Sequence, residues 1–142
     1  MLTEPIKGEL NVKDESKTRE FLSQLTKETA RLTGLDEKYI EEFEQVVQSA
    51  TLFDLYLDFD PAIGYTFKTL GAGFWALRSG LSFEEALTEL VFEGGDADTN
   101  GAVAGALLGC KFGFRAIPPR WIAGLCHREW FTERIRKVLD MM

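Results

Sequence analysis

The sequence has few of the side chains that bind zinc, with one histidine and two cysteines among 142 residues. Structural zinc sites need four such ligands at short spacings, and His127, Cys110 and Cys126 do not show them. Two cysteines also make no disulfide framework in a chain of this length. We therefore expect no zinc site, reduced thiols and a cytoplasmic protein.

Long apolar runs and an excess of positive charge are missing as well. The best candidate for a membrane span, residues 101–109, is far shorter than the ~20 residues required, and the N-terminus lacks a signal-peptide core. The chain has 23 acidic and 16 basic residues, a net charge of −7, and the whole excess lies within residues 1–60. Without a basic stripe we expect neither a nucleic acid nor a membrane as a partner.

Helical periodicity runs through most of the chain, and alternation of strand period is absent. We predict an all-α fold with an irregular N-terminal arm over residues 1–13 and a single helical domain over residues 14–142. Ser82 and Glu85 have the spacing of a capping box at a helix start. The expected helices lie at about residues 16–32, 36–50, 62–79, from 82, from the turn at 94–99 to 112, 121–126 and 132–139.

A turn at residues 94–99 gathers oxygen ligands. Asp96, Asp98 and Thr99 supply two carboxylates and a hydroxyl, which suit Mg²⁺, Mn²⁺ or Ca²⁺. Gly94 and Gly95 allow left-handed backbone angles and a close approach to a bound group. The simpler reading is that one aspartate caps the next helix, which the helix dipole favours by about 0.3–1 kcal/mol. A second aspartate and a threonine exceed what capping needs, and both readings stay open.

A calcium-binding EF-hand is the first alternative to test, because residues 96–101 match the first six positions of its loop. That loop needs a bidentate glutamate at position twelve. The residue there is Leu107, within an apolar stretch. The EF-hand is therefore excluded.

Glycine recurs every four residues after the turn, at Gly101, Gly105, Gly109 and Gly113. Each glycine in a helix interior costs up to about 1 kcal/mol relative to alanine. The usual compensation is the close approach of another helix. We expect such a helix to pack along this stripe, near the turn.

The segment from Gly94 to Ala106 resembles the signature of the ADP-ribosylglycohydrolases, also called the dinitrogenase-reductase-activating glycohydrolase family. Flanking segments resemble the family in the same order, so that the resemblance covers residues 62–125 and the C-terminal half of the family fold. These segments are Ile63-Gly64-Tyr65, residues 74–78, residues 83–87 and Ile117-Pro118-Pro119-Arg120-Trp121.

The resemblance implies an orthogonal bundle of α-helices around a dinuclear Mg²⁺ or Mn²⁺ centre. It also implies hydrolysis of the glycosidic bond that attaches ADP-ribose to an acceptor, so an ADP-ribosylated substrate or ADP-ribose would be the partner. Asp96, Asp98 and Thr99 match one group of metal ligands in the family. Gly64, Tyr65, Gly94 and Gly95 fall where the family lines its substrate cleft, and no catalytic residue is assignable in this half.

The family's first metal group, a Thr-Asp-Asp run in the N-terminal half, has no counterpart here. Asp54, Asp58 and Asp60 are separated, lack the threonine and stand in the wrong order relative to Gly64. The resemblance therefore predicts a half-built metal site, completed by an N-terminal counterpart in another chain or accompanied by self-association into a homo-oligomer. The alternative is a catalytically inactive binding or scaffold protein that keeps the helical bundle.

Overall fold

The computed structural model describes residues 15–141, and the predicted arm over residues 1–13 lies outside them. The described chain is helical and contains no strand, which confirms the all-α prediction. Its elements are α2 (Glu15–Thr33), α3 (Glu37–Gln48), η1 (Phe53–Leu55), η2 (Asp60–Ala62), α4 (Thr66–Arg78), α5 (Phe83–Phe92), α6 (Ala97–Phe112), η3 (Phe114–Ala116), α7 (Pro119–Gly124) and α8 (Arg128–Leu139).

The boundaries of α5 and α6 follow local sequence signals. Ser82 begins α5 with the predicted capping box, in which its hydroxyl accepts the Glu85 backbone N–H and the Glu85 carboxylate accepts the Ser82 N–H. Helix α6 begins at Ala97, inside the segment 94–99 that was predicted as a turn, so Asp98 and Thr99 lie in its first helical turn. It ends before Gly113, whose φ is +76°. The immediate start of α6 leaves no room for a twelve-residue calcium loop.

Helix α4 begins later than its apolar pattern predicts, at Thr66 instead of residue 62. The short 3₁₀ turn η2 precedes it, and Gly64 then takes a φ of +77°, outside the helical region. The apolar pattern of residues 62–79 places Ile63 on one helix face with Phe67 and Leu70. In the structure Ile63 lies in the loop before α4 and stays exposed.

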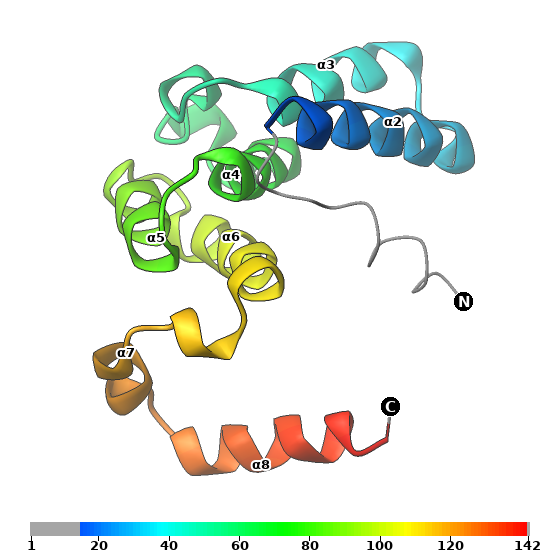
Figure 1. Cartoon of the computed structure of the whole chain (residues 1–142). Helices are drawn as coiled ribbons and strands as arrows, with labels where there is room; N and C mark the ends of the chain where they lie inside the picture. Colours follow the sequence, from blue (N-terminus) through cyan, green and yellow to red (C-terminus); the bar gives the residue numbers. More distant parts are fainter. Residues whose placement is uncertain (1–14, 142) are drawn as a thin grey trace.

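The helices are stacked across one another (Figure 1). Helices α2 and α3 form an antiparallel pair that lies across α4, and α4 also packs against α5 and α6. Helix α7 follows below this bundle, and α8 lies apart from it. None of the helices between residues 15 and 141 is long and apolar enough to cross a membrane.

Helix α4 is the centre of the core. Ala72 and Ala76 have no exposed surface, and they pack in one cluster with Trp75, Leu90 of α5 and Leu108 of α6. Fully burying one large aliphatic side chain stabilises a fold by about 1.5–3 kcal/mol. The contact between α4, α5 and α6 therefore holds the element that carries the turn.

The close approach of α4 to α6 depends on a glycine of α4, Gly73, and much less on the glycine stripe of α6. A Cβ atom at Gly73 would lie 2.9 Å from Leu107 Cδ1. A Cβ at Gly105 would lie 3.7 Å from Leu87 Cδ1, an ordinary contact, and one at Gly109 would meet nothing within 4 Å. Gly113 ends the helix. The predicted partner helix is thus α5, which packs beside Gly101 and Gly105 near the turn at ordinary contact distance and not beside Gly109.

The apolar face predicted for α2 also differs from the buried one. The helical period over residues 16–32 places Leu25 and Leu32 on one side with Phe21 and predicts that this side is the apolar face, but Leu25 and Leu32 are both exposed. Leu22, Thr26 and Ala30 are buried instead. Helix α2 lies at the edge of the bundle, where α3 is its main neighbour, and one neighbour covers only a narrow stripe.

Candidate functional site

The Gly94–Gly95 turn lies directly against another backbone segment. Gly94 and Gly95 both take the predicted left-handed angles, with φ of +77° and +64°. A Cβ at Gly95 would lie 2.1 Å from the Leu57 carbonyl oxygen and 3.2 Å from the Asp58 nitrogen. No side chain fits there, so glycine is what allows the turn to rest on the loop before α4.

The same loop brings Gly64 beside the first aspartate of the turn. Gly64 has a φ of +77°, and a Cβ there would lie 3.2 Å from Asp96 Oδ2. Gly64 and Asp96 lie far apart in the chain, and the sequence predicted that both belong to one candidate site. In the structure they are neighbours. The absence of a side chain at Gly64 keeps the surroundings of the Asp96 carboxylate open.

The side chains of Asp96 and Asp98 lie close together at the start of α6. Hydrogen bonding to the Asp96 side chain, and then the Thr99 N–H, which donates to Asp98 Oδ1 at 3.0 Å, hold the pKa of Asp98 below its ordinary value. Two ionised carboxylates side by side repel each other, and a cation bound between them relieves the repulsion.

Helix capping does not occupy the Asp96 carboxylate. Asp96 is the N-cap residue of α6, yet its side chain makes no capping hydrogen bond. The contact it makes with the first turn is through its backbone, whose carbonyl accepts the Asn100 N–H at 2.9 Å. The carboxylate is half-buried at the surface and remains available to a bound group.

Within residues 15–141, no three His, Cys, Asp or Glu side chains come together as a group that could hold a metal ion. The acidic residues of the preceding loop do not add to Asp96 and Asp98. Asp54 instead accepts the Thr51 backbone N–H at 2.9 Å. The described part of the chain thus offers two carboxylates and the Thr99 hydroxyl, which is about half of the six oxygen ligands of an octahedral ion.

Tyr65 faces α3. Its hydroxyl donates to Glu42 Oε2 at 3.1 Å, and its ring lies 5.4 Å from that of Phe67. Burial, and then the hydrogen bond to Glu42, raise the pKa of Tyr65 above its ordinary value. In this arrangement the side chain links α3 to α4, and its role toward a substrate stays a prediction.

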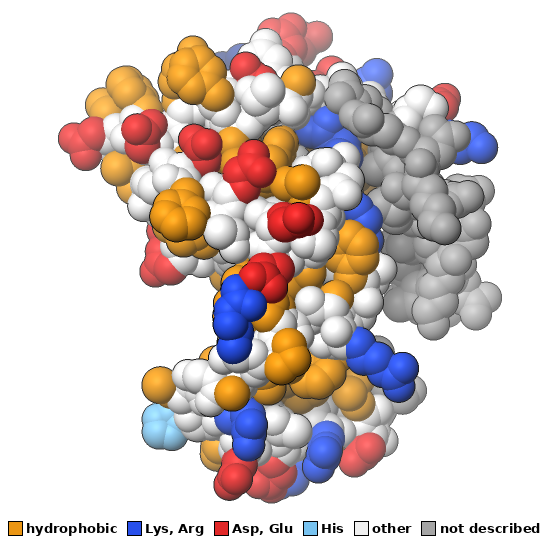
Figure 2. Space-filling view, turned by 60° about the vertical axis from the view of Figure 1, so that its left-hand side comes forward, with side chains coloured by type: hydrophobic (Ala, Val, Ile, Leu, Met, Phe, Trp, Pro, Cys, Tyr) orange, Lys and Arg blue, Asp and Glu red, His pale blue; other side chains and the backbone are white. Residues whose placement is uncertain are grey.

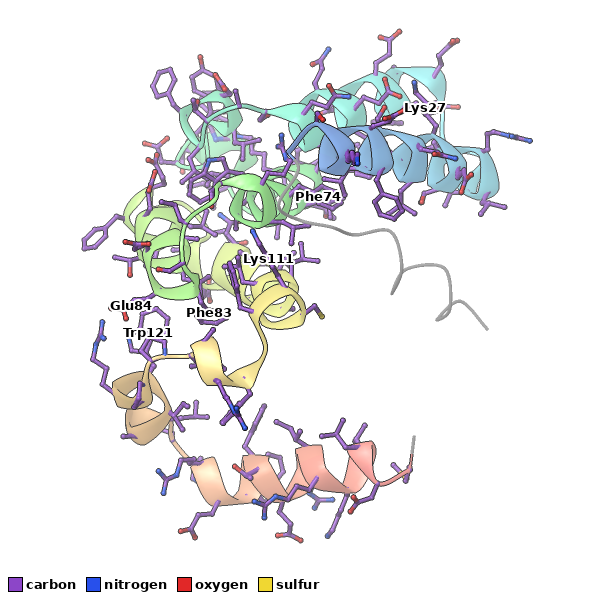
Figure 3. All side chains as sticks on the ribbon, in the orientation of Figure 1. Lys27, Phe74, Phe83, Glu84, Lys111 and Trp121 are labelled. Carbon is purple, nitrogen blue, oxygen red and sulfur yellow. The ribbon has the colours of Figure 1, made fainter. Side chains whose placement is uncertain are left out.

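Several residues that position the turn were not singled out from the sequence. Asn100 follows the ligand group and is 2% exposed. Lys111, at the far end of α6, donates to the Leu77 carbonyl at the end of α4 at 2.7 Å (Figure 3). The Leu57–Asp58 backbone supports Gly95. Of these residues only Asn100, which lies within the signature segment, could have been found from the sequence, because the other contacts join segments that are distant in the chain.

The sequence profile of the ADP-ribosylglycohydrolase family matches residues 4–142. An uncharacterised protein of Archaeoglobus fulgidus is 44% identical over 68 residues, 48% of this chain and 22% of that protein. The ADP-ribosyl-[dinitrogen reductase] glycohydrolase of Rhodospirillum rubrum is 46% identical over 62 residues, 43% of this chain and 20% of its own length. An ADP-ribosylarginine hydrolase of Pseudomonas putida is 29% identical over 77 residues, 54% of this chain and 21% of its own length.

The aligned stretch thus spans about a fifth of the length of these relatives, 20% to 22%. No solved structure matches the chain.

Proposed function

The chain belongs to the ADP-ribosylglycohydrolase family, and from that premise we propose that it supplies one part of a metal-dependent site that hydrolyses an ADP-ribosyl glycosidic bond. The observation that carries the proposal is the pair of carboxylates at Asp96 and Asp98. The Asp96 carboxylate makes no capping hydrogen bond to α6, so it is available to a bound cation. The names of two relatives, an ADP-ribosylarginine hydrolase and an ADP-ribosyl-[dinitrogen reductase] glycohydrolase, support this reaction class.

The donor set fits a hard divalent cation. Carboxylate and hydroxyl oxygens are the ligands of Mg²⁺ and Mn²⁺, and Asp96, Asp98 and Thr99 would hold the ion. Such an ion polarises substrate oxygens and positions water for attack on the glycosidic carbon. The pKa of Asp98 is lowered from a value that is already acidic, so its carboxylate stays ionised, the form that binds a cation, to a lower pH than an ordinary aspartate.

The chain's own residues give the site its position and its space. Gly95 fixes the turn against the Leu57 carbonyl, and Gly64 leaves room next to Asp96 Oδ2. A sugar hydroxyl could approach the carboxylates there without meeting a side chain from position 64. Gly64 thus acts in this proposal as a backbone wall of the substrate site, and Gly95 holds the turn in place.

Further ligands are needed for a complete centre, because two carboxylates and one hydroxyl leave about half of an octahedral shell to water. We propose that a complementing segment, in another chain or elsewhere in a longer protein, supplies them. The described residues alone are then expected to bind Mn²⁺ weakly and to release ADP-ribose slowly or not at all.

Titration calorimetry with Mn²⁺ tests the ligand assignment. We expect weak binding by the wild-type chain and no measurable heat from Asp96→Asn or Asp98→Asn. Asp36→Asn is the matched control, since Asp36 is exposed and makes no side-chain capping hydrogen bond. Unchanged binding in both turn variants would show that the turn is structural.

Release of ADP-ribose from an ADP-ribosylarginine substrate tests the reaction. The chain is assayed alone and mixed with candidate complementing chains, with Mn²⁺ or with a chelator. We expect metal-dependent release from a complementing mixture and its loss with Asp98→Asn. Absence of release from every mixture would refute the hydrolase proposal.

The alternative is a non-catalytic binding protein that keeps the family's helical bundle. It is favoured by the absence of a third His, Cys, Asp or Glu side chain near Asp96 and Asp98 within residues 15–141. The two functions separate in one measurement: this alternative predicts ADP-ribose binding that does not change when Asp96 or Asp98 is replaced.

A further inference from the structure

Helix α8 is amphipathic and has no buried residue. All twelve residues from Arg128 to Leu139 are exposed. Five large apolar side chains keep between 48% and 62% of their surface: Trp130, Phe131, Ile135, Val138 and Leu139. Isolated helices shorter than ~12–15 residues are marginal in water. A helix of this length and apolar content therefore requires a packing partner.

An apolar groove lies between α5 and α6, on the bundle itself. It has a volume of about 280 Å³ and is lined by Leu87, Thr88, Val91, Phe92, Gly101 and Trp121. Phe92 on its rim is 86% exposed. Pockets for small molecules usually measure roughly 300–1,000 Å³ and carry several polar groups. A nearly apolar groove below that range suits one or two inserted side chains.

The connection between α7 and α8 carries α8 away from the groove of its own chain. Leu125, which ends α7, is extended, and His127 takes a left-handed φ of +55°. Figure 1 shows the result, with α8 on the far side of α7 from α5. We propose that two copies of the chain exchange these helices, so that α8 of each copy packs into the α5–α6 groove of the other.

Charge favours this occupant. Helix α8 carries four basic residues (Arg128, Arg134, Arg136, Lys137) and two acidic ones (Glu129, Glu133), a net charge of +2. Helix α5 carries three glutamates and no base, a net charge of −3. Figure 2 shows several Asp and Glu side chains over the upper left of one face, and Lys and Arg interspersed with Asp and Glu over the lower part. The groove lining itself is uncharged, and Arg120 of α7 pairs with Glu84. The attraction therefore acts between α8 and the other glutamates of α5, Glu85 and Glu89, whereas two copies of α5 repel.

The exchange buries enough surface for a stable dimer. An aromatic side chain has 150–250 Å² of surface, so a half-exposed one offers about 100 Å². One or two apolar side chains of α8 fill the groove, and the others lie on its exposed rim at Val91 and Phe92. The five side chains together offer on the order of 500 Å² per helix, so two exchanged helices bury about 1,000 Å² of their own surface, to which the covered groove and rim add. Stable specific interfaces bury about 1,200–2,000 Å² in total. A reciprocal exchange also closes into a two-fold dimer, with no free groove left.

Sedimentation velocity of the full chain tests the exchange. We expect a dimer at ~10 µM and at least a ten-fold larger dissociation constant for Phe131→Glu in α8 and for Phe92→Glu on the groove. Leu32→Glu is the matched control, because Leu32 is an apolar residue on α2 with 88% of its surface exposed. A monomeric wild type at 100 µM, or equal weakening by Leu32→Glu, would overturn the proposal.

Mixing the two variants separates exchange from other kinds of dimer. A heterodimer of Phe131→Glu and Phe92→Glu keeps one intact pair, α8 of the second variant on the groove of the first. We expect more dimer in the mixture than in either variant alone, and raising the salt concentration should weaken the wild-type dimer. No gain on mixing would refute the exchange. Neither measurement needs metal or substrate, so its failure leaves the proposed hydrolase function untouched.

Discussion

Replacing Gly95 by alanine is the sharpest test of how the turn is held. A Cβ there would lie 2.1 Å from the Leu57 carbonyl oxygen and 2.6 Å from the Leu57 carbonyl carbon. Both are backbone atoms, so no side chain can rotate away to relieve the contact. Either the turn or the loop that precedes α4 must move. Gly94 provides the matched control, because it also has a positive φ but meets nothing within 4 Å.

The two substitutions share one cost and differ in another. A left-handed conformation costs a residue with a Cβ about 1–2 kcal/mol, and both variants incur it. Overpacking against rigid neighbours adds about 1–3 kcal/mol, and only Gly95→Ala incurs that. We therefore expect Gly94→Ala to lower the free energy of unfolding by about 1–2 kcal/mol and Gly95→Ala by about 2–5 kcal/mol.

Urea unfolding followed by far-ultraviolet circular dichroism measures the difference. If the slope against urea is unchanged, the shift in midpoint reports stability alone. For a domain of this size, 1 kcal/mol corresponds to a change in Tm of about 3–4 °C. Losses that agree to within about 0.5 kcal/mol would refute the argument, because they would mean that the turn does not rest on the Leu57 backbone.

The remaining predictions concern packing, capping and pH. Gly73→Ala should lower the free energy of unfolding by about 1–3 kcal/mol, because its Cβ would meet α6 side chains at 2.9 and 3.0 Å. Gly109→Ala, with nothing within 4 Å of its Cβ, should raise the free energy of unfolding by about 0.5–1 kcal/mol. Thermal unfolding should therefore give a lower Tm for Gly73→Ala and a higher Tm for Gly109→Ala than for the wild type. Ser82→Ala should cost about 1 kcal/mol by loss of the α5 cap, and an unchanged urea midpoint would contradict it. The pKa of Asp98 is lowered in the folded chain, so its contribution to stability is complete above the unfolded pKa and is lost as the pH falls through the folded one. Between pH 6 and pH 3, Asp98→Asn should therefore lose less stability than the wild type, and equal losses would contradict the assignment.

The helices were predictable from sequence where their signals are local. The capping box at Ser82, the stop at Gly113 and the start of α6 at the turn each depend on a few neighbouring residues. The start of α4 was not predictable in this way, because the apolar pattern continues through Ile63 while the backbone leaves the helical region at Gly64. Apolar periodicity records which residues favour burial, and it does not record where the backbone turns.

Burial was less predictable than helicity. Leu32 fits the apolar pattern of α2 and is 88% exposed, because α3 is the main neighbour of α2. The glycines of α6 suggested a close approach that the structure places at Gly73 of α4 instead. Periodicity gives the face of a helix, whereas the number and distance of its neighbours come from the tertiary arrangement.

For the candidate site, too, some properties follow from the sequence and others only from the tertiary structure. The sequence by itself determined its chemistry: two carboxylates, a hydroxyl and two left-handed glycines within six residues, in a chain that lacks zinc ligands. Only the tertiary structure decided what surrounds that turn. It set Gly95 on the Leu57 backbone, brought Gly64 next to Asp96 and turned Tyr65 toward Glu42. The physical reason is the distance along the chain over which each property is determined. Ligand type and backbone freedom belong to single residues, whereas contacts between distant segments form only when the helices pack around α4.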